Sequence, residues 1–185
     1  AASDVYKRQG IVRANVHGTN NLLEHAVKSG ADRFLFFSSG EVYGQVLDSN
    51  KPITELDYGY INPLEIRSVY GESKRLGENV CIAWSEIYGL HTSIVRPFHT
   101  YGPGMDLNDG RVYADFVADV VLGRPLKIKG DGQARRPFCY IADATIGFLT
   151  VLLKGESGHA YNVANPYSEL SVQELAELIA SLFQD

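Results

Sequence analysis

Apolar residues recur along nearly the whole chain, at helical spacing in some stretches and in strand-like runs in others. A helix is predicted over residues 11–29, where apolar side chains recur three or four positions apart and Ser29-Gly30 supplies a stop signal. Residues 33–37 form an apolar run without alternation, which is typical of a strand covered on both faces. A second helix, closed by Gly89, precedes another short strand at residues 92–95.

Strand, helix and strand in this order form a βαβ unit, so the two strands are expected to be parallel with a right-handed crossover. Residues 45–66, before the second helix, are punctuated by turn residues and are predicted to be a loop. The fold class is therefore α/β with a doubly wound parallel sheet, in which ligands bind beyond the carboxyl ends of the strands. Ser39 and Glu41 follow the first strand, and residues 97–101 follow the second.

Beyond Gly104 the elements become shorter. The pattern predicts a helix at 112–121, strands at 126–128, 138–141 and 161–163, a turn at Gly130-Asp131-Gly132, a helix capped by Asp143 that runs to about 153, and a final helix opened by the capping box of Ser171 and Glu174.

Composition excludes several classes of function. A chain of 185 residues with a net charge of −5 and no stripe of basic residues is not expected to bind nucleic acid. Its two cysteines lie far apart without metal-ligand spacing, so no metal is expected. No apolar run reaches the roughly 18 residues of a membrane span, and a cytoplasmic location is expected. Residues 1–9 share no periodicity with the rest and are interpreted as a sequencing scar.

Tyr70 and Lys74 carry the first chemical signal. Four residues apart on a helix, their side chains lie on the same face, and an ammonium beside a phenol favours the phenolate. Such a pair suits removal of a proton from an alcohol. Taken alone, the same spacing also fits two side chains on a solvated helix face.

The surrounding motifs resemble those of the extended short-chain dehydrogenase/reductases, the NAD-dependent nucleotide-sugar epimerases and dehydratases. The resemblance covers about residues 10–185, and its pieces occur in the expected order. They are Asn15, Gly18-Thr19, Ser38-Ser39, Val42-Tyr43-Gly44, Tyr70 with Lys74, Arg96-Pro97, Tyr101-Gly102-Pro103, Gly130-Asp131-Gly132, Arg136 and Tyr161-Asn162-Val163.

Within that family the chain looks most similar to the UDP-glucuronate decarboxylases, also called UDP-xylose synthases. The matching stretches are Glu41 to Gly44, Asn62-Pro63, Arg67 to Tyr70, Asn108 to Val112 and Arg136 to Tyr140. The resemblance implies a carboxy-lyase that forms UDP-xylose through a 4-keto intermediate. Nucleotide-sugar 4,6-dehydratases are the runner-up, but Gly40 stands where they carry an acid, and 4-epimerases usually lack the glutamate at position 41.

Residue roles follow from the resemblance. It implies that Ser39, Glu41, Tyr70 and Lys74 are catalytic and that Asn15 and Pro97, with Tyr70 and Lys74, bind NAD. His99, Arg111 and Arg136 would bind the nucleotide-sugar, with Arg136 on the diphosphate and Arg135 solvated. Most of these residues also have an interpretation without function. Ser39 could cap a turn, Glu41 could lie on the surface, Asn15 could bond neighbouring backbone, His99 could lie in the core, and Arg111 and Arg136 could be solvated. Two departures from the decarboxylases, His99 for asparagine and Gly104 for arginine, leave the sugar open.

The family's domain plan implies that residues 10–108 are the C-terminal half of an NAD-binding Rossmann domain and that 109–185 form a smaller α/β substrate-binding region. Helix 143–153 is expected to pack back on the Rossmann sheet. No glycine-rich phosphate loop is found, so the first third of the family fold is expected to lie outside this chain. The whole protein is expected to be a homodimer, and a non-catalytic fragment is the alternative of another class.

Overall fold

The structure is a computed structural model that describes residues 8–46, 51–108 and 110–183. Contacts group these residues into two compact units. The first contains the described residues as far as Pro97 together with Ile146–Val163, and the second contains Phe98–Thr145 and the described residues from Ala164 onward. Within the described ranges, no helix is long and apolar enough to cross a membrane. The division after residue 108 and the role of each part stay predictions.

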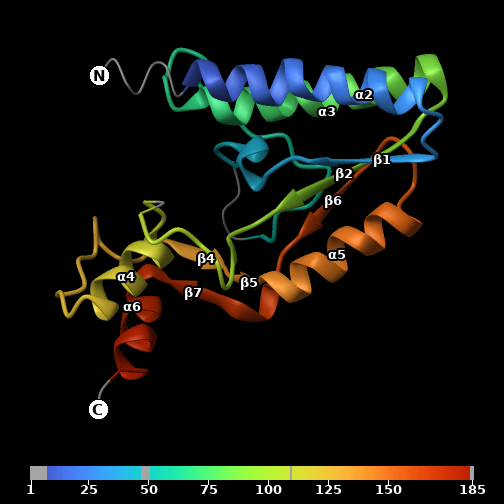
Figure 1. The fold of residues 1–185 in the computed structure, drawn as a ribbon. Helices are drawn as coiled ribbons and strands as arrows, with labels where there is room; N and C mark the ends of the chain where they lie inside the picture. The colour runs from blue at the N-terminus through green and yellow to red at the C-terminus, as the bar shows by residue number, and fades with distance from the viewer. Residues whose placement is uncertain (1–7, 47–50, 109, 184–185) are drawn as a thin grey trace. The chain divides into compact units, whose positions relative to one another are not determined.

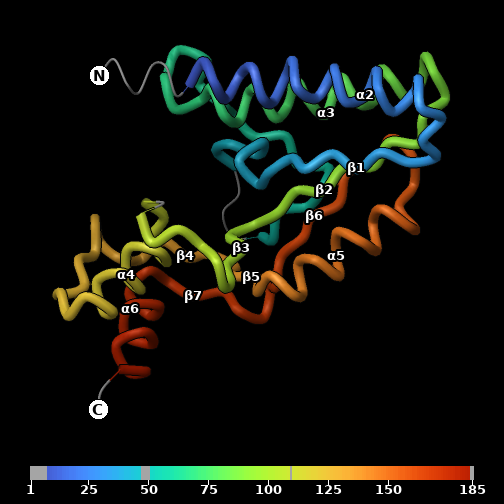
Figure 2. The backbone as a smooth tube through the Cα atoms, in the orientation of Figure 1, coloured from blue at the N-terminus to red at the C-terminus, as the bar shows by residue number. Residues whose placement is uncertain are grey.

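The first unit is built on a three-stranded parallel sheet. Its strands are β1 (Arg33–Phe37), β2 (His91–Pro97) and β6 (His159–Val163), in the order β1-β2-β6. Phe37 pairs with Val95 at the carboxyl end of β1, and Pro97 pairs with Val163 at that of β2. Figure 2 shows the three strands running side by side. The strands predicted near residues 33–37, 92–95 and 161–163 are confirmed, as is the parallel pairing expected of the first two.

Helices cover both faces of this sheet, as Figure 1 shows. On one face lie α2 (Thr19–Lys28) and α3 (Ser68–Tyr88), and on the other lies the part of α5 (Ile141–Lys154) that belongs to this unit. Phe36 is buried in a core with Leu23, Cys81 and Ile94, which come from α2, α3 and β2. The next residue, Phe37, stacks edge-on against Phe148 of α5. Strand β1 is apolar from Phe34 to Phe37 because each of its faces meets a helix.

The helix predicted over residues 11–29 is irregular. Residues 8–12 are helical, residues Arg13–Gly18 form a π-helical segment (η1), and α2 continues from Thr19. A π-turn widens the helix locally and often marks a functional position. Periodicity predicted the helix but not this turn, because a single turn hardly disturbs the apolar spacing. Helix α3 ends as predicted, at Gly89, which takes the left-handed conformation with φ 69°.

The second unit contains two short ladders and two helices. Strand β3 (Thr100–Tyr101) runs parallel to β5 (Cys139–Tyr140), and β4 (Arg135–Pro137) runs antiparallel to β7 (Glu169–Ser171). Helices α4 (Val112–Val121) and α6 (Val172–Ser181) pack on a core of Phe116, Phe138, Leu175, Ala176 and Ile179. A short 3-10 turn, η3 (Pro166–Ser168), precedes β7. The predicted capping box of Ser171 and Glu174 is present.

Two local predictions in this region are wrong, and a third is confirmed only in part. Residues 126–128 form no strand, because no neighbouring segment pairs with them among the described residues. The strand predicted at 138–141 is present only as β5, because the N–H of Phe138 bonds to the carbonyl oxygen of Ser168 and Ile141 already begins α5. Asp143 does not cap α5, since that helix already begins at Ile141 and Asp143 lies in its first turn.

Candidate active site

Tyr70 and Lys74 lie near the start of α3, close to the carboxyl end of β1. The Lys74 ammonium donates to the carbonyl oxygen of Phe37 at 2.6 Å, and it lies 5.8 Å from the centroid of the Tyr70 ring. Burial beside the sheet lowers the pKa of Lys74, because desolvation disfavours its charged form. The bond to Phe37 fixes the ammonium where the first strand ends, with Tyr70 beside it.

Ser39 and Glu41 lie on the turn that follows β1. Ser39 is the N-cap of a 3-10 helix, η2 (Gly40–Tyr43), and its Oγ accepts a hydrogen bond from the Glu41 N–H at 3.2 Å. Glu41 is exposed, whereas Val42 and Tyr43 are buried and anchor the turn. The exposed carboxylate and the capping hydroxyl are therefore held on a turn that is itself fixed in the core.

Gly71 brings this turn against the helix that carries Tyr70. A Cβ built on Gly71 would lie 3.0 Å from the Glu41 carbonyl oxygen and 2.9 Å from Cδ1 of Ile61. Arg75 adds two bonds from the same helix, to the carbonyl oxygens of Val42 and Gly59, each at 2.7 Å. All four residues predicted to be catalytic, Ser39, Glu41, Tyr70 and Lys74, therefore lie on two segments of one unit that contact each other directly.

Asn15 and Pro97, predicted to bind cofactor, lie in the same unit. The π-helical segment η1 directs the Asn15 amide to the Ser73 hydroxyl at 2.9 Å, and Ser73 donates in turn to the Tyr70 carbonyl oxygen at 2.8 Å. Asn15 therefore supports the turn of α3 between Tyr70 and Lys74. Pro97 is the last residue of β2. Their contact with a cofactor stays a prediction.

His99, Arg111 and Arg136 line a cavity of about 350 Å³ in the second unit. This volume falls in the range of small-molecule sites. Lys127 and Lys129 add positive charge to the wall, and Lys129 also pairs with Asp115 at 3.3 Å. Aromatic rings supply the remaining surface: those of Tyr101 and Tyr113 have centroids 4.9 Å apart, and Phe138 lies next to Tyr101. Such a cavity suits an anion attached to a flat ring.

His99 has the only positive φ of any non-glycine residue among those described, at 22°. Desolvation lowers its pKa to about 4, and the positive charges of Arg136 and Arg111 act in the same direction. Because the residue keeps an exposed surface, solvent screens part of this effect. The imidazole is therefore neutral at physiological pH and can both donate and accept a hydrogen bond in the cavity.

Arg135 and Arg136 have different surroundings. Arg136 bonds the carbonyl oxygen of Arg135 at 2.7 Å and lines the cavity. Arg135 is exposed, as expected of a solvated residue, and it also forms ion pairs with Glu174 at 3.1 Å and with Glu169 at 3.7 Å. These ion pairs follow from the antiparallel pairing of β4 with β7, which brings Glu169 and the start of α6 beside Arg135 and which short-range patterns do not reveal.

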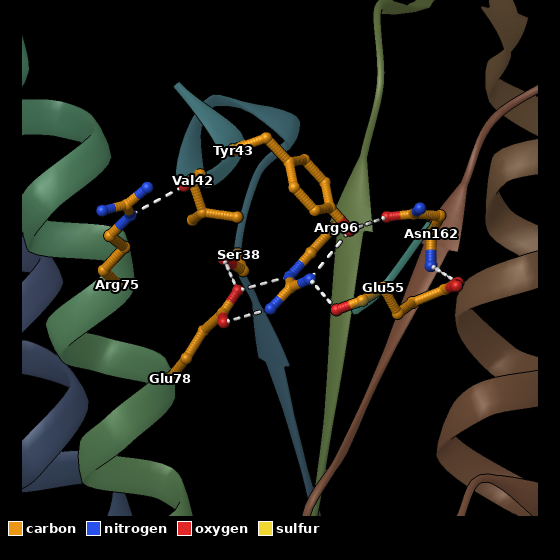
Figure 3. A network of polar contacts seen from close by, with 8 residues as sticks. All are labelled: Ser38, Val42, Tyr43, Glu55, Arg75, Glu78, Arg96 and Asn162. Atoms are coloured by element: carbon orange, nitrogen blue, oxygen red, sulfur yellow. Dashed lines mark hydrogen bonds and ion pairs between the residues drawn. The ribbon is translucent and has the colours of Figure 1, made fainter. Parts of the chain in front are cut away.

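A buried polar network beneath the Ser39 turn was missed by the sequence analysis (Figure 3). Arg96 of β2 binds Glu78 of α3 through two parallel bonds of 2.9 Å and 2.7 Å, and Glu78 also accepts a bond from the Ser38 hydroxyl. The third nitrogen of Arg96 bonds the Tyr43 hydroxyl at 2.8 Å. Tyr43 donates to Asn162 of β6 at 2.6 Å. Tyr43, Arg96 and Asn162 lie in the motifs identified from the sequence, and Glu78 follows Lys74 by one helical turn, but no local pattern links these residues to one another.

Comparison with known proteins places this site in a family. A model described as the NAD dependent epimerase/dehydratase family matches residues 2–164. The chain belongs to this family. The short strand, capped turn and Tyr-x-x-x-Lys helix described above lie within the matched residues, and the predicted Rossmann-like fold class is confirmed by solved relatives.

Relatives of known name fall into several groups of nucleotide-sugar enzymes. UDP-glucuronic acid decarboxylase 6 of Arabidopsis thaliana is 38% identical over 94% of this chain and 49% of its own length. A dTDP-glucose 4,6-dehydratase from Streptomyces venezuelae, solved with NAD bound, is 31% identical with a TM-score of 0.81 over 100% of this chain and 54% of its own. UDP-glucuronic acid 4-epimerase from Bacillus cereus, solved with UDP-glucuronic acid and NAD, is 25% identical with a TM-score of 0.80, covering 92% of this chain and 52% of its own.

The chain thus spans half or less of the length of the decarboxylases that it matches, 49% for two of those from Arabidopsis and 39% for that of Xenopus tropicalis. Other decarboxylases of the group, such as that of Xenopus tropicalis at 36% identity, match a similar share of this chain. The family is therefore established by the part of the fold present here, while the reaction belongs to the whole protein.

Proposed function

We propose that the full-length protein is an NAD-dependent carboxy-lyase that converts UDP-glucuronate to UDP-xylose. The observation that carries this proposal is the position of the Lys74 ammonium, bonded to Phe37 at the end of β1 and next to the Tyr70 ring. Similarity to UDP-glucuronic acid decarboxylases over nearly all of the chain supports the choice of substrate.

The residues at the end of β1 fit a nicotinamide cofactor. An ammonium can donate three hydrogen bonds, so Lys74 can bind ribose hydroxyls while it holds the Phe37 carbonyl oxygen. Tyr70, Pro97 and Asn15 would complete the nicotinamide end of the site. NAD, when bound, would supply the acceptor for the C4 hydride of the sugar and later return that hydride. Solved relatives with NAD bound support this assignment.

Tyr70 would take the proton of the sugar 4-hydroxyl. The Lys74 ammonium lies beside the Tyr70 ring, where it can stabilise the negative charge that the phenol oxygen carries during this proton transfer. Ser39 would donate its hydroxyl proton to the oxygen at C4, since its Oγ accepts from Glu41 N–H and keeps its own proton for donation. Tyr70 would thus remove the proton from the oxygen at C4, and Ser39 would stabilise the negative charge that develops on the same oxygen.

A uronate oxidised at C4 has its ketone β to the carboxylate, so loss of CO₂ leaves a resonance-stabilised enolate. Glu41 would direct the transfer of the proton that C5 then receives. Elimination of the 6-hydroxyl, as in a dehydratase, needs an acid beside that base, and η2 carries no carboxyl group other than Glu41 because position 40 is glycine. This supports decarboxylation over dehydration.

The cavity of the second unit would bind the nucleotide diphosphate. Arg111 and Arg136 can bind phosphate oxygens, and Arg136 is suited to a bidentate contact. The aromatic rings of Tyr101 and Tyr113 would lie against the base. His99, neutral in this cavity, would contact the sugar or phosphate without adding charge.

The test is a product analysis of the full-length protein with NAD⁺ and UDP-glucuronate labelled with ¹³C at the carboxylate. We expect labelled CO₂ and a UDP-pentose by mass spectrometry, with UDP-glucose, which lacks the carboxylate, as the control substrate. A six-carbon product that has lost water would favour the dehydratase reading, and an isomer of unchanged mass would favour a 4-epimerase. NAD binding without turnover of any nucleotide sugar would support the non-catalytic alternative.

The same proposal includes a homodimer located in the cytoplasm. Apolar side chains remain exposed on helices α2 and α3, among them Leu22 at 59%, Leu76 at 46% and Ile87 at 71% exposure. A second subunit could cover them. Both cysteines are free, which fits a reducing compartment. Sedimentation of the full-length protein at the mass of a monomer would contradict the dimer.

A further inference from the structure

The network around Arg96 joins the segments that carry the catalytic residues. Glu78 lies one turn after Lys74 on α3, and it accepts bonds from both Arg96 and Ser38. Ser38 immediately precedes Ser39 and is further held by its N–H, which donates to the Val95 carbonyl oxygen at 2.8 Å. One carboxylate thus ties the helix of Tyr70 to the strand end that carries Ser39.

The opposite side of the Arg96 guanidinium holds the rest of the turn. One nitrogen of Arg96 donates to the Tyr43 hydroxyl at 2.8 Å and to the Glu55 carbonyl oxygen at 3.1 Å. The guanidinium also lies over the Tyr43 ring, 4.9 Å from its centroid. Since Tyr43 ends η2 and donates to Asn162, the turn is fixed to β2 and β6 at once. Figure 3 shows Arg96 between Glu78 and Tyr43.

From this geometry we infer that Arg96, Glu78 and Tyr43 are positioning residues, which set the placement of Ser39 relative to Tyr70 and Lys74. The inference rests on the proposed function. None of the three residues is assigned a contact with substrate or cofactor. Their role is to hold two separate segments, the turn after β1 and helix α3, in one fixed arrangement.

Burial of the pair argues for geometry rather than for stability alone. The side chains of Arg96 and Glu78 are 9% and 13% exposed. Moving two charges out of water costs about as much as their attraction returns, so a buried ion pair is weak evidence for stability. An apolar pair could fill the same space, but it could not fix a fork-shaped contact in two directions. Catalytic groups need this kind of support, because a displacement of about 1 Å can cost roughly 100-fold in rate.

Tyr43 has a second consequence for the site. Desolvation raises the pKa of its phenol and outweighs the opposing effect of Arg96. Its proton is committed to Asn162. Tyr43 therefore stays protonated where Tyr70 is proposed to act as phenolate, and Tyr43 does not provide a competing base.

The experiment uses the full-length protein with NAD⁺ and the variants Arg96→Met, Glu78→Gln and the double variant. We expect kcat to fall about 10–100-fold in each single variant while KM changes by less than about 3-fold, because geometry and not substrate contact is lost. The double variant should lose little more than the worse single variant, since residues acting as one unit are not additive. Tyr43→Phe, which keeps the ion pair, should show a smaller loss of kcat. This variant tests the inference if Arg96→Met does not fold.

Arg33→Met is the matched control. Arg33 also holds its strand, β1, through bonds from its guanidinium, to the carbonyl oxygens of Leu152 and Gly155 at 3.3 Å and 3.2 Å, but at the opposite end of that strand. We expect its kcat to stay within about 2-fold of the wild type. Equal loss of kcat in Arg33→Met and Arg96→Met, or additive loss in the Arg96/Glu78 double variant, would overturn the inference.

Amide hydrogen exchange separates this inference from the proposed reaction. If the wild type converts no nucleotide sugar, the proposed function fails, and exchange then decides the inference alone. Arg96→Met should accelerate exchange in a peptide covering residues 38–44, where the Ser38, Val42 and Gly44 amides are hydrogen-bonded. Arg33→Met should leave this peptide unchanged. Unchanged exchange in Arg96→Met would overturn the inference.

Discussion

Gly77 decides how closely α3 approaches β1, and the variant Gly77→Ala tests this directly. A Cβ at position 77 would lie 2.4 Å from Cζ of Phe36 and 3.1 Å from each Cε. Non-bonded carbons prefer separations of about 3.5–4.0 Å, so the ring or the helix must move by about 1 Å. Phe36 is only 6% exposed and packed in the core, which leaves the ring little room. We expect part of the displacement to lift α3 off the sheet.

Two opposing effects set the magnitude. Overpacking a well-packed core costs typically about 1–3 kcal/mol. Alanine in place of a helical glycine returns about 0.5–1 kcal/mol, because glycine loses more conformational freedom on folding. From the midpoints of both ranges, about 2 and about 0.75 kcal/mol, the net loss is about 1.25 kcal/mol and should lower Tm by roughly 2.5–5 °C, at about 2–4 °C for each kcal/mol. The activity should fall as well, since the 2.6 Å bond from Lys74 to Phe37 spans the same gap between helix and strand.

Thermal melts and kcat of the full-length protein measure both effects. Phe36→Leu removes the Cε and Cζ atoms that meet the new methyl group. The double variant should therefore lose at most about half of the free energy of unfolding that the two single variants lose when their losses are added. Gly10→Ala is the control, because no atom lies within 4 Å of its built Cβ and a small gain is expected. A Gly77→Ala protein that melts at or above the wild-type temperature, or strict additivity with Phe36→Leu, would refute the reasoning.

Further predictions concern single side chains. Tyr70→Phe should lower kcat by about 100-fold or more with little change in substrate affinity, and near-normal turnover would show that Tyr70 is not the base. His99 has a folded-state pKa of about 4, below its unfolded value, so its contribution to stability is present above about pH 6.5 and is lost as pH falls toward 4. His99→Asn should therefore flatten the dependence of Tm on pH in this window. An unchanged slope would contradict this prediction. Desolvation and then the Glu78 charge raise the pKa of Cys81 to about 12, so iodoacetamide should not modify it in the native protein at pH 8, as mass spectrometry can check. Residues 1–185 expressed alone should aggregate, because β1 pairs on one side only among the described residues, and a monomer with a cooperative melt would contradict this.

The elements of the first unit could be predicted because local signals agree with their surroundings. The unbroken apolar run of β1 reports that both faces are covered, and the structure supplies the reason in Phe36 and Phe37. Gly89 ends α3 through a conformation that glycine adopts most easily. The segment at 126–128 misled the prediction because alternation signals a strand only when a partner strand is available, and partner choice is a long-range property.

Candidate site residues also divide into those with local signals and those that depend on long-range partners. Tyr70 and Lys74 were predictable because the helix alone brings them to one face, and Ser39 because it follows an apolar run. The cation pattern of the cavity was predictable only in part: Arg136 lines it, whereas Arg135 is held by Glu169 and Glu174 through a strand pairing. A residue's role is readable from sequence when its partners are local.

Arg96 shows what lies beyond that limit and why it matters for the site. Its partners Glu78, Tyr43 and Glu55 lie 18 to 53 positions away in sequence, so no spacing rule links them. Desolvation alone would lower the pKa of Arg96, but its bonds to Glu78 and Tyr43 outweigh this and raise it, so the charge is fixed in the core. A buried charge of this kind tolerates the loss of neither partner. Replacing Glu78, whose side chain is 13% exposed, should therefore disturb the Ser39 turn more than replacing the exposed Glu41 on that turn. Of these two glutamates, however, Glu41 is the one proposed to touch the substrate.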